Sequence, residues 1–435
     1  MLYSTTVDRL IHSGSPKART PVTDNPAVDT PRPDWAAIDD AVRRARLDSP
    51  VLTLDLDLLE HNIADLRRRA SGVPIRVASK SLRVRSIIDD VLSRDGYAGV
   101  LAFDVAEAHW LATESGVSDV LLGYPTAKKE ALATLFADEL ACRRVTLLVD
   151  DVAQLDLVDA VLPPAKRPVV RVAIDLDASL RAVGGRVHLG VRRSPIHSVD
   201  QATALARTIV GRDGFALVGV MSYEAQVAGL GNDVDGKFAM NTAVSAIQAV
   251  SMTEIRHRRG KVISALREIA NLEFVNAGGT GSLEETAKDK SVTDIAAGSG
   301  LFGGHLFDNY RHFRPAPAMA FGLDVLRRPD DEIVTCAGGG WIASGPPAQD
   351  RLPKPVWPEG LEYISTESAG EVQTPLTGAA ARGLSVGDRV WFRHTKSGEV
   401  AERAARVALI KRDSSGVADV VDVVPTYRGE GKCFL

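Results

Sequence analysis

Short apolar runs alternate with helix-like segments along most of this 435-residue chain. The expected strands are 74–79, 97–102, 119–123, 145–149, 169–174, 217–222, 273–276 and 293–297. The helix-like segments that separate most of them are 83–93, 104–115, 127–140, 151–161, 198–211 and 239–270. Continuously apolar runs are typical of strands buried on both faces of a parallel sheet. Eight such repeats predict an α/β fold, a closed TIM-like (β/α)8 barrel, with a doubly wound open sheet as the alternative.

The segments that flank these repeats have a different pattern. Residues 13–34 are rich in Ser, Pro, Thr and Asp, which predicts an irregular arm, and a short helix is expected at 36–46. A strand is expected at 51–54 and an amphipathic helix at 56–70. After residue 315, many prolines and short apolar runs predict a mostly β domain. We therefore expect an arm with a short helix at 1–49, the barrel at 50–315 and a C-terminal β domain at 316–435.

Composition excludes several classes of function. The net charge is −4 and no run of Lys and Arg stands out, so nucleic acid is not an expected partner. No apolar stretch reaches the roughly 18 residues that span a bilayer, and the N-terminus lacks the features of a secretory signal. Cys142, Cys336 and Cys433 have neither disulfide-framework nor zinc-pair spacing. The chain is therefore expected to be cytoplasmic, without membrane partners.

A lysine ends the first of the eight expected strands. Lys80 follows the apolar segment 74–78 and is flanked by Ser79 and Ser81. In a barrel the carboxyl ends of the strands carry the active site. An amine there forms a Schiff base with an aldehyde cofactor, and burial is expected to lower its pKa. A solvated surface charge is the alternative interpretation of such a lysine taken alone.

Two glycine-rich loops, 277–282 and 298–304, follow the seventh and eighth expected strands. In this fold those two positions commonly form the phosphate-binding corner. Glycine allows backbone N–H groups to approach a phosphate closely, and Thr280, Ser282 and Ser299 add hydroxyl donors. Either loop alone is equally well explained as a turn. Together with Lys80, the two loops predict a site for pyridoxal 5'-phosphate (PLP).

Motifs in a fixed order along the chain resemble one family of PLP enzymes. They are the segment 50–55 with Asn62, then 76–81, 174–177, 189–192, 219–224 and 278–280, and finally 387–390 with His394. Over residues 50–435 the chain resembles the fold-type III PLP enzymes, the alanine racemase-like barrels, and within them the D-threonine aldolase and D-serine dehydratase branch. The resemblance implies that Lys80 binds PLP covalently and that Arg192 and Tyr223 lie near the cofactor or substrate. It also implies a phosphate site formed by Gly278, Gly279, Thr280, Gly298, Ser299 and Gly300.

His394 is the second catalytic residue that this resemblance implies. Metal-dependent members pair the corresponding histidine with Cys or Asp two residues later, where this chain has Lys396. A protonated lysine is a poor metal ligand. We therefore expect weak or no dependence on a divalent metal, with His394 and Glu399 as the candidate ligands. His394 is expected to act directly as a base on the substrate, and a purely local hydrogen bond is the alternative.

Several reactions are open to a PLP enzyme of this kind. If Lys80 removes the α-proton and a β-hydroxyl leaves, dehydration yields a keto acid, whereas removal of the hydroxyl proton breaks the Cα–Cβ bond. We favour a homodimeric lyase of amino acid metabolism that acts on a β-hydroxy amino acid, expected to be of D-configuration, by aldol cleavage or dehydration. An amino-acid racemase is one alternative, but Tyr310, Tyr363 and Tyr427 show no racemase context for the second base. A non-catalytic PLP-binding protein is the other, and it would not need the C-terminal domain.

Overall fold

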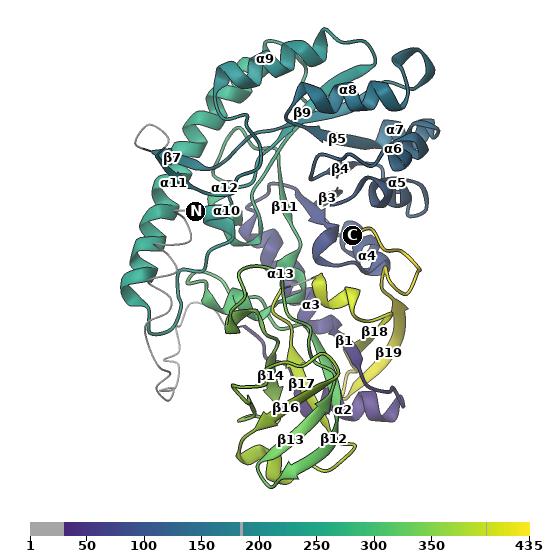
Figure 1. Cartoon of the computed structure of the whole chain (residues 1–435), viewed down its shortest axis with the longest axis vertical. Coiled ribbons are helices and arrows are strands. Elements are labelled where there is room, and N and C mark those ends of the chain that lie inside the picture. The colour runs from purple at the N-terminus through teal and green to yellow at the C-terminus, as the bar shows by residue number, and fades with distance from the viewer. Residues whose placement is uncertain (1–29, 183–185, 397) are drawn as a thin grey trace. The chain divides into compact units, whose positions relative to one another are not determined.

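A computed structural model describes residues 30–182, 186–396 and 398–435 (Figure 1). Residues 13–29 of the predicted arm lie outside the described residues. The described chain divides into two compact units. The first comprises Gly123–Ile295 and Asp308–Arg314, and the second comprises Pro31–Leu122, Ala296–Phe307 and Pro315–Leu435.

Eight parallel strands close into a barrel, which confirms the predicted (β/α)8 fold and makes the open-sheet alternative wrong. In pairing order they are β10 (Phe274–Ala277), β11 (Asp294–Ala297), β2 (Ile75–Ala78), β3 (Tyr97–Ala102), β4 (Val120–Leu122), β5 (Val145–Val149), β6 (Val170–Asp175) and β9 (Phe215–Met221). Within the first unit, Val149 of β5 pairs with Ile174, and Asp175 of β6 pairs with Met221 of β9. The carboxyl ends of these three strands therefore lie level with one another.

Helix α3 (Leu56–Arg69) lies between β1 (Val51–Asp55) and the first barrel strand of the chain, and helices follow most of the barrel strands. They are α4 (Arg85–Leu92), α5 (Val105–Thr113), α6 (Lys129–Phe136), α7 (Glu139–Arg144), α8 (Val152–Val161), α9 (Val199–Val210) and α11 (Phe238–Arg267), with the short α10 (Ala225–Ala228), α12 (Leu283–Thr286) and α13 (Ser299–Phe302). The single helix expected at 127–140 is wrong, because α6 ends before Asp138 and α7 begins after it. The Asp138 side chain accepts a hydrogen bond from the Ala141 N–H (2.9 Å), which is the arrangement of a helix N-cap.

The mostly β C-terminal part is confirmed, and it forms a nine-stranded sheet. Its strands are β1 (Val51–Asp55), β12 (Met319–Asp330), β13 (Ile333–Ala337), β14 (Lys354–Trp357), β15 (Glu362–Tyr363), β16 (Gln373–Thr377), β17 (Arg389–Arg393), β18 (Arg406–Arg412) and β19 (Ala418–Pro425). The main order is β15-β16-β13-β12-β1-β18-β19, and β17 pairs with β12 and β14. Because β1 pairs antiparallel with β12 and parallel with β18, a strand that precedes the barrel completes this sheet.

Helix α2 (Trp35–Arg44) packs on the sheet of the same unit. Ile38 and Val42 of α2 belong to one buried cluster with Trp391 of β17 and Ile410 of β18. The Trp391 indole N–H also donates to the Asp39 carboxylate (3.1 Å). Full burial of an aliphatic side chain stabilises a fold by about 1.5–3 kcal/mol. These contacts therefore anchor the short helix that was expected at 36–46.

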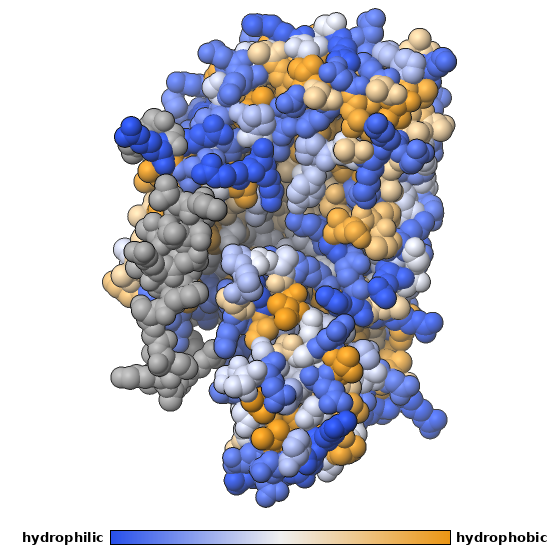
Figure 2. All heavy atoms as spheres, viewed as in Figure 1, coloured by the Kyte–Doolittle hydropathy of each residue, from blue (hydrophilic) through white to orange (hydrophobic). Residues whose placement is uncertain are grey.

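The first unit also contains a two-stranded hairpin, β7 (Leu180–Ala182) and β8 (Val187–Leu189). The face of the molecule in Figure 2 is mainly hydrophilic, with hydrophobic residues in small separate groups. Exposed large apolar residues include Phe238, Val372 and Val386, and scattered residues of this kind are common on protein surfaces. Among the described helices, none combines the length and the apolar character that crossing a membrane requires.

Candidate active site

Lys80 lies in a one-turn 3-10 helix, Ser79–Ser81, directly after β2. Ser79 Oγ donates to the carbonyl oxygen of Leu101 (3.1 Å), and Ser81 Oγ is hydrogen-bonded to Ser299 Oγ (2.9 Å). The turn that carries Lys80 is therefore held on both sides. Lys80 as a residue is exposed, whereas three of the four residues of β2 before it are buried.

The second glycine loop lies against this turn, within the same unit. Gly298 follows β11, and a Cβ atom at Gly298 would collide with the carbonyl oxygen of Ala78, the last residue of β2. Only glycine allows so close an approach of two backbones. Ser299 and Gly300 then begin the short helix α13. The structure thus brings Gly298 and Ser299 to the Lys80 turn.

A buried carboxyl group lies next to the Lys80 turn, and no sequence motif indicated it. Glu107 is fully buried and accepts hydrogen bonds from the Phe103 N–H (2.8 Å) and the Tyr427 hydroxyl (2.9 Å). The Ser79 side chain also lies close enough to this carboxyl to lower its pKa. Burial raises the pKa of Glu107 to about 7, although the hydrogen bonds act to lower it. Glu107 therefore connects the Lys80 turn to the C-terminal segment.

The first glycine loop follows β10 and belongs to the other unit. Gly278 has φ +75°, a left-handed conformation that favours glycine, and its N–H donates to Glu224 Oε2 (2.8 Å). The N–H of Gly279 donates to Ser282 Oγ (3.2 Å). A Cβ atom at Gly279 would lie 3.2 Å from the Tyr223 ring, so the loop and Tyr223 are closely packed. Two of the donors predicted for a phosphate are thus engaged within the protein.

A buried ion network supports this loop. The Arg259 guanidinium of α11 lies 2.7 Å from Glu224 Oε1 and 2.8 Å from Asp289 Oδ2, and the Arg259 side chain is 0% exposed. Arg259 also donates to Ser222 Oγ (2.8 Å), just beyond the end of β9. Because Glu224 binds the Gly278 N–H with its other oxygen, the network fixes the first glycine loop relative to β9.

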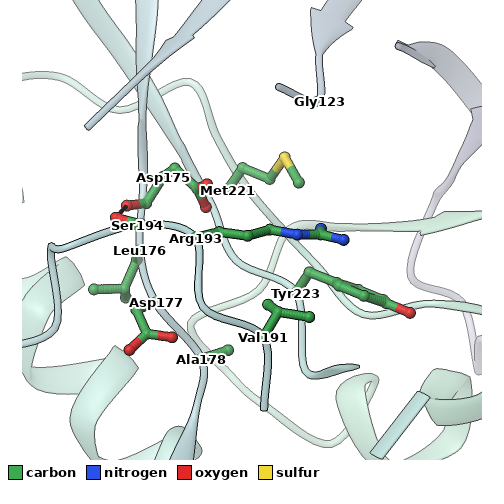
Figure 3. A pocket seen from close by; sticks show the side chains of 10 residues that line it. All are labelled: Gly123, Asp175, Leu176, Asp177, Ala178, Val191, Arg193, Ser194, Met221 and Tyr223. Carbon is green, nitrogen blue, oxygen red and sulfur yellow. Dashed lines mark hydrogen bonds between the residues drawn. The ribbon is translucent and has the colours of Figure 1, made fainter. Parts of the chain in front are cut away.

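A small pocket opens at the carboxyl ends of β6 and β9 in the first unit (Figure 3). Its lining comprises Gly123, Asp175, Leu176, Asp177, Ala178, Val191, Arg193, Ser194, Met221 and Tyr223. Its volume is about 20 Å³, which is room for about one water molecule. The Arg193 guanidinium lies 5.7 Å from the centre of the Tyr223 ring, within cation–π range. The resemblance implied Arg192 at this position, and the lining contains the following residue, Arg193, instead.

Asp175 ends β6 and is the pocket residue with the most unusual acidity. Burial raises the pKa of Asp175 to about 7, and the nearby carboxylates of Asp150 and Asp177 also act to raise it, against the opposing charge of Arg193. A carboxyl group that holds a proton near neutral pH is characteristic of catalytic sites. Sequence reasoning missed Asp175, although its place at the end of an expected strand is the same feature that singled out Lys80.

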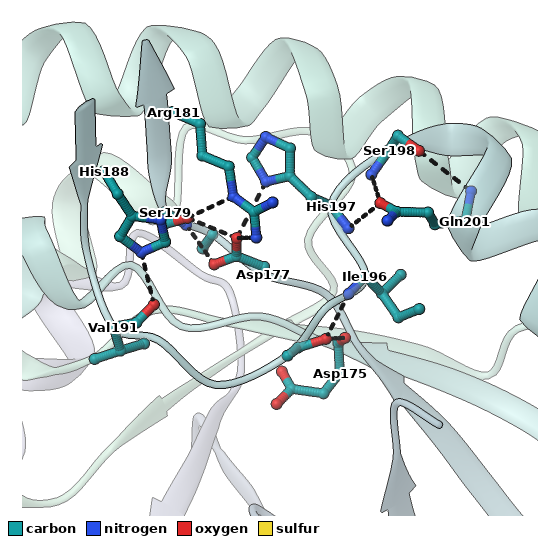
Figure 4. Close-up of polar contacts among 12 residues, drawn as sticks. Asp175, Asp177, Ser179, Arg181, His188, Val191, Ile196, His197, Ser198 and Gln201 are labelled. Atoms are coloured by element: carbon teal, nitrogen blue, oxygen red, sulfur yellow. Dashed lines mark hydrogen bonds and ion pairs between the residues drawn. The ribbon is translucent and has the colours of Figure 1, made fainter. Parts of the chain in front are cut away.

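Asp177, two residues later, has the opposite acidity. It accepts hydrogen bonds from Ser179 Oγ (2.6 Å), Arg181 (2.6 Å) and His197 Nδ1 (3.2 Å) (Figure 4). Burial alone would raise the pKa of Asp177, but these donors hold it well below its usual range. Asp177 is therefore a fixed carboxylate that ties β7 to the segment before α9.

His394 follows β17 and is enclosed within the second unit. The ring is 2% exposed, and its Nδ1 lies 3.1 Å from the carbonyl oxygen of Met319, so this nitrogen carries a hydrogen and donates it. Burial, together with the charge of Arg393, lowers the pKa of His394 to about 3. The imidazole is consequently neutral over the physiological pH range.

The residues around His394 do not fit a divalent metal. Lys396 Nζ donates to the carbonyl oxygen of Ser344 (2.7 Å). The carboxylate of Glu399 accepts hydrogen bonds from the N–H (2.8 Å) and the hydroxyl of the same serine. Throughout the part of the chain that the structure describes, no group of three His, Cys, Asp or Glu residues is arranged to hold a metal ion.

Comparisons with known proteins agree with this architecture. The profile of the family described as "Alanine racemase, N-terminal domain" matches residues 54–305. None of the curated proteins matches the sequence. Among solved structures, the chain is similar to D-threonine aldolase from Filomicrobium marinum, with 20% identity, a TM-score of 0.69, and coverage of 88% of this chain and 96% of that one.

Two further structures have the same fold. D-threo-3-hydroxyaspartate dehydratase from Delftia sp. HT23 is 19% identical, with a TM-score of 0.67 and coverage of 87% of this chain and 97% of that one. Alanine racemase from Clostridium difficile 630 is 13% identical, with a TM-score of 0.55 and coverage of 87% and 99%. The predicted resemblance to the alanine racemase-like barrels is thus confirmed, and at these identities the structural similarity establishes the fold.

Proposed function

Because the chain belongs to the alanine racemase N-terminal domain family, we propose that it is a PLP-dependent lyase that acts on a β-hydroxy amino acid of D-configuration. One observation carries this proposal. The Lys80 turn and the Gly298 loop are in contact at the carboxyl ends of the adjacent barrel strands β2 and β11. The aldolase and dehydratase among the similar structures support the substrate class.

The residues at these strand ends fit PLP. The Lys80 amine is suited to bind the cofactor aldehyde, and the loops after β10 and β11 carry the small residues and the hydroxyls of Thr280 and Ser299 that would hold the phosphate. These two strands and β2 are consecutive in the barrel. When bound, PLP supplies an electron sink for negative charge at the Cα atom of an amino acid.

The residues of the proposed site would each have a defined role in the reaction. Lys80 Nζ holds the cofactor and moves the α-proton of the substrate, and the Ser81–Ser299 hydrogen bond keeps its turn in place. Tyr223, packed on Gly279, and the neighbouring Arg193 would face the substrate. An arginine is well suited to bind a carboxylate through paired hydrogen bonds.

The tyrosines weighed for a racemase support the lyase instead. A racemase needs a second base on the opposite face of the cofactor. The hydroxyls of Tyr310, Tyr363 and Tyr427 donate to Ala228 O (2.8 Å), Pro353 O (2.7 Å) and Glu107 Oε1 (2.9 Å). Each of the three is thus engaged in a structural hydrogen bond within its own chain.

The cofactor assignment is tested with purified protein reconstituted with PLP. Wild type should show the visible absorption band of lysine-bound PLP. Lys80→Ala should lose this band, and its activity should fall by at least about 10²-fold, because the amine serves as base. Lys396→Ala, which removes another lysine of the same unit, is the matched control and should keep the band. An unchanged spectrum in Lys80→Ala would reject the assignment.

The reaction is tested with D- and L-isomers of β-hydroxy amino acids. Keto acid, aldehyde and α-proton exchange are measured together, with and without chelator. We expect keto acid or aldehyde from D-isomers, and activity that persists in chelator. Inversion of alanine or serine without dehydration or carbon–carbon cleavage would overturn the lyase.

A further inference from the structure

The pocket at the ends of β6 and β9 contains a carboxyl group to which the proposed function gives no task. Asp175 shares this pocket with Arg193 and Tyr223 (Figure 3). Tyr223 in turn packs against Gly279 of the first glycine loop. All of these residues belong to one unit. A carboxyl group thus lies one side chain away from the loop proposed to hold the cofactor.

The charges that face Asp175 come from each strand end around it. The end of β5 contributes Asp150, which follows Val149, the partner of Ile174 in the sheet. The segment after β6 contributes Asp177, and the loop after β8 contributes Arg193. Beyond β9 lies the phenol of Tyr223. Burial and the two carboxylates outweigh the guanidinium, so the carboxyl group keeps its proton near neutral pH.

The histidine expected to act on the substrate is held differently. His394 is enclosed, and the hydrogen on its Nδ1 is donated to Met319 O. That proton is therefore engaged in a hydrogen bond within the protein. An efficient general acid has a pKa near the working pH, and Asp175 meets that condition.

We propose that Asp175 is the general acid that protonates the β-hydroxyl group as it leaves the substrate, which makes dehydration the reaction of this site. This inference rests on the proposed function. The Cβ–O bond breaks with its electron pair on oxygen, that oxygen takes the Asp175 proton, and water departs. The electron pair of the Cα–H bond forms the new Cα–Cβ double bond, and Lys80 Nζ takes the α-proton. The substrate therefore loses one molecule of water, and Asp175 is left as a carboxylate.

The lining of the pocket agrees with this role. Arg193 at the same pocket offers a positive charge that would stabilise the carboxylate formed when Asp175 gives up its proton.

The test compares Asp175→Asn with Asp150→Asn in the reconstituted holoenzyme. Both substitutions keep side-chain size, but only the first removes the proposed acid. Two rates are measured on each D-β-hydroxy amino acid turned over by wild type: keto-acid formation and exchange of the α-proton with solvent deuterium. Each is followed from pH 5 to 9, in steps of about half a unit, a range that brackets the pKa of about 7 of Asp175.

Asp175→Asn should slow keto-acid formation by about 10²–10⁴-fold while α-proton exchange and the visible band persist. In wild type the dehydration rate should fall as pH rises through about 7, because the acid loses its proton. Since the Asp150 carboxylate raises the pKa of Asp175, Asp150→Asn should shift this descending limb to lower pH without lowering the maximal rate.

Three outcomes would overturn the inference. One is a dehydration rate in Asp175→Asn close to that of wild type, and another is a wild-type rate that rises through this pH range, which would indicate a base. The third is equal loss of exchange and dehydration in Asp175→Asn, which would indicate substrate binding. Failure of the proposed function is recognised separately, because wild type itself would then lack the visible band or would yield neither keto acid nor aldehyde.

Discussion

At the scale of single residues, Glu107 makes the stability of the fold depend on pH. Its pKa of about 7 in the folded chain exceeds the value of about 4.3 expected in the unfolded chain. As pH rises between these values, the unfolded state loses its proton first, so the free energy of unfolding decreases and then levels off. Its total decrease should be at most about 4 kcal/mol.

Glu107→Gln removes the titrating group and should flatten this dependence, as measured by urea denaturation at several pH values. Glu139→Gln, at a residue whose side chain is 76% exposed, is the control and should leave the dependence unchanged. A Glu107→Gln variant that loses stability over the same range as wild type would contradict the role assigned to Glu107.

Sequence patterns identified Lys80 and the glycine loops because strand-end and glycine-rich positions are recognisable in a chain. They did not identify Glu107 or Asp175, since a lone acidic residue has no motif, and its acidity depends on burial. The sequence also could not show whether Arg192 or Arg193 lines the pocket. The chain turns at Gly190, where φ is +135°, and no periodicity predicts which arginine then faces the pocket.

At the scale of elements, the buried Arg259 of α11 should be essential to the first glycine loop. Arg259→Met leaves the Glu224 and Asp289 carboxylates buried without their partner, which should cost about 3–5 kcal/mol of stability. Because Glu224 also binds the Gly278 N–H, the affinity for PLP should fall as well. Both quantities are measured by denaturation and by titration of the visible band.

Arg382→Met serves as the control for this prediction, because the Arg382–Glu332 pair is exposed and such pairs contribute about 0–1 kcal/mol. If Arg259→Met proved as stable as Arg382→Met, or bound PLP as tightly as wild type, the supporting role of the network would be refuted.

The barrel strands were predictable one by one because each is a continuous apolar run, and all five residues of β5, for example, are buried. Helix boundaries within the segment 127–140 were harder to predict. The interruption at Asp138 between α6 and α7 depends on a helix cap and not on the hydrophobic periodicity. Strand β12 begins at Met319, within a proline-rich stretch, so the sequence pattern did not predict this strand.

At the scale of the whole molecule, sequence proximity gave little information about which segments meet. Strand β1 pairs with β12 and β18, hundreds of residues further along. The Lys80 turn likewise depends on Ser299, and its neighbour Glu107 on Tyr427. Such long-range contacts form only in the folded chain. Local sequence patterns could therefore predict the helices and strands but not which distant residues pair with each other.

The proposed cofactor site is also built from segments that are far apart in the sequence. PLP binding should therefore stabilise the folded chain. A ligand that binds only the folded chain stabilises it by RT ln(1 + [L]/Kd), about 2.7 kcal/mol at a hundredfold excess over Kd. PLP should raise the melting temperature of the apoprotein clearly more than pyridoxal, which lacks the phosphate that the glycine loops are proposed to hold. In Lys80→Ala the PLP effect should shrink without vanishing, because only the covalent bond is lost. Equal shifts with PLP and pyridoxal would show that the loops after β10 and β11 do not bind the phosphate.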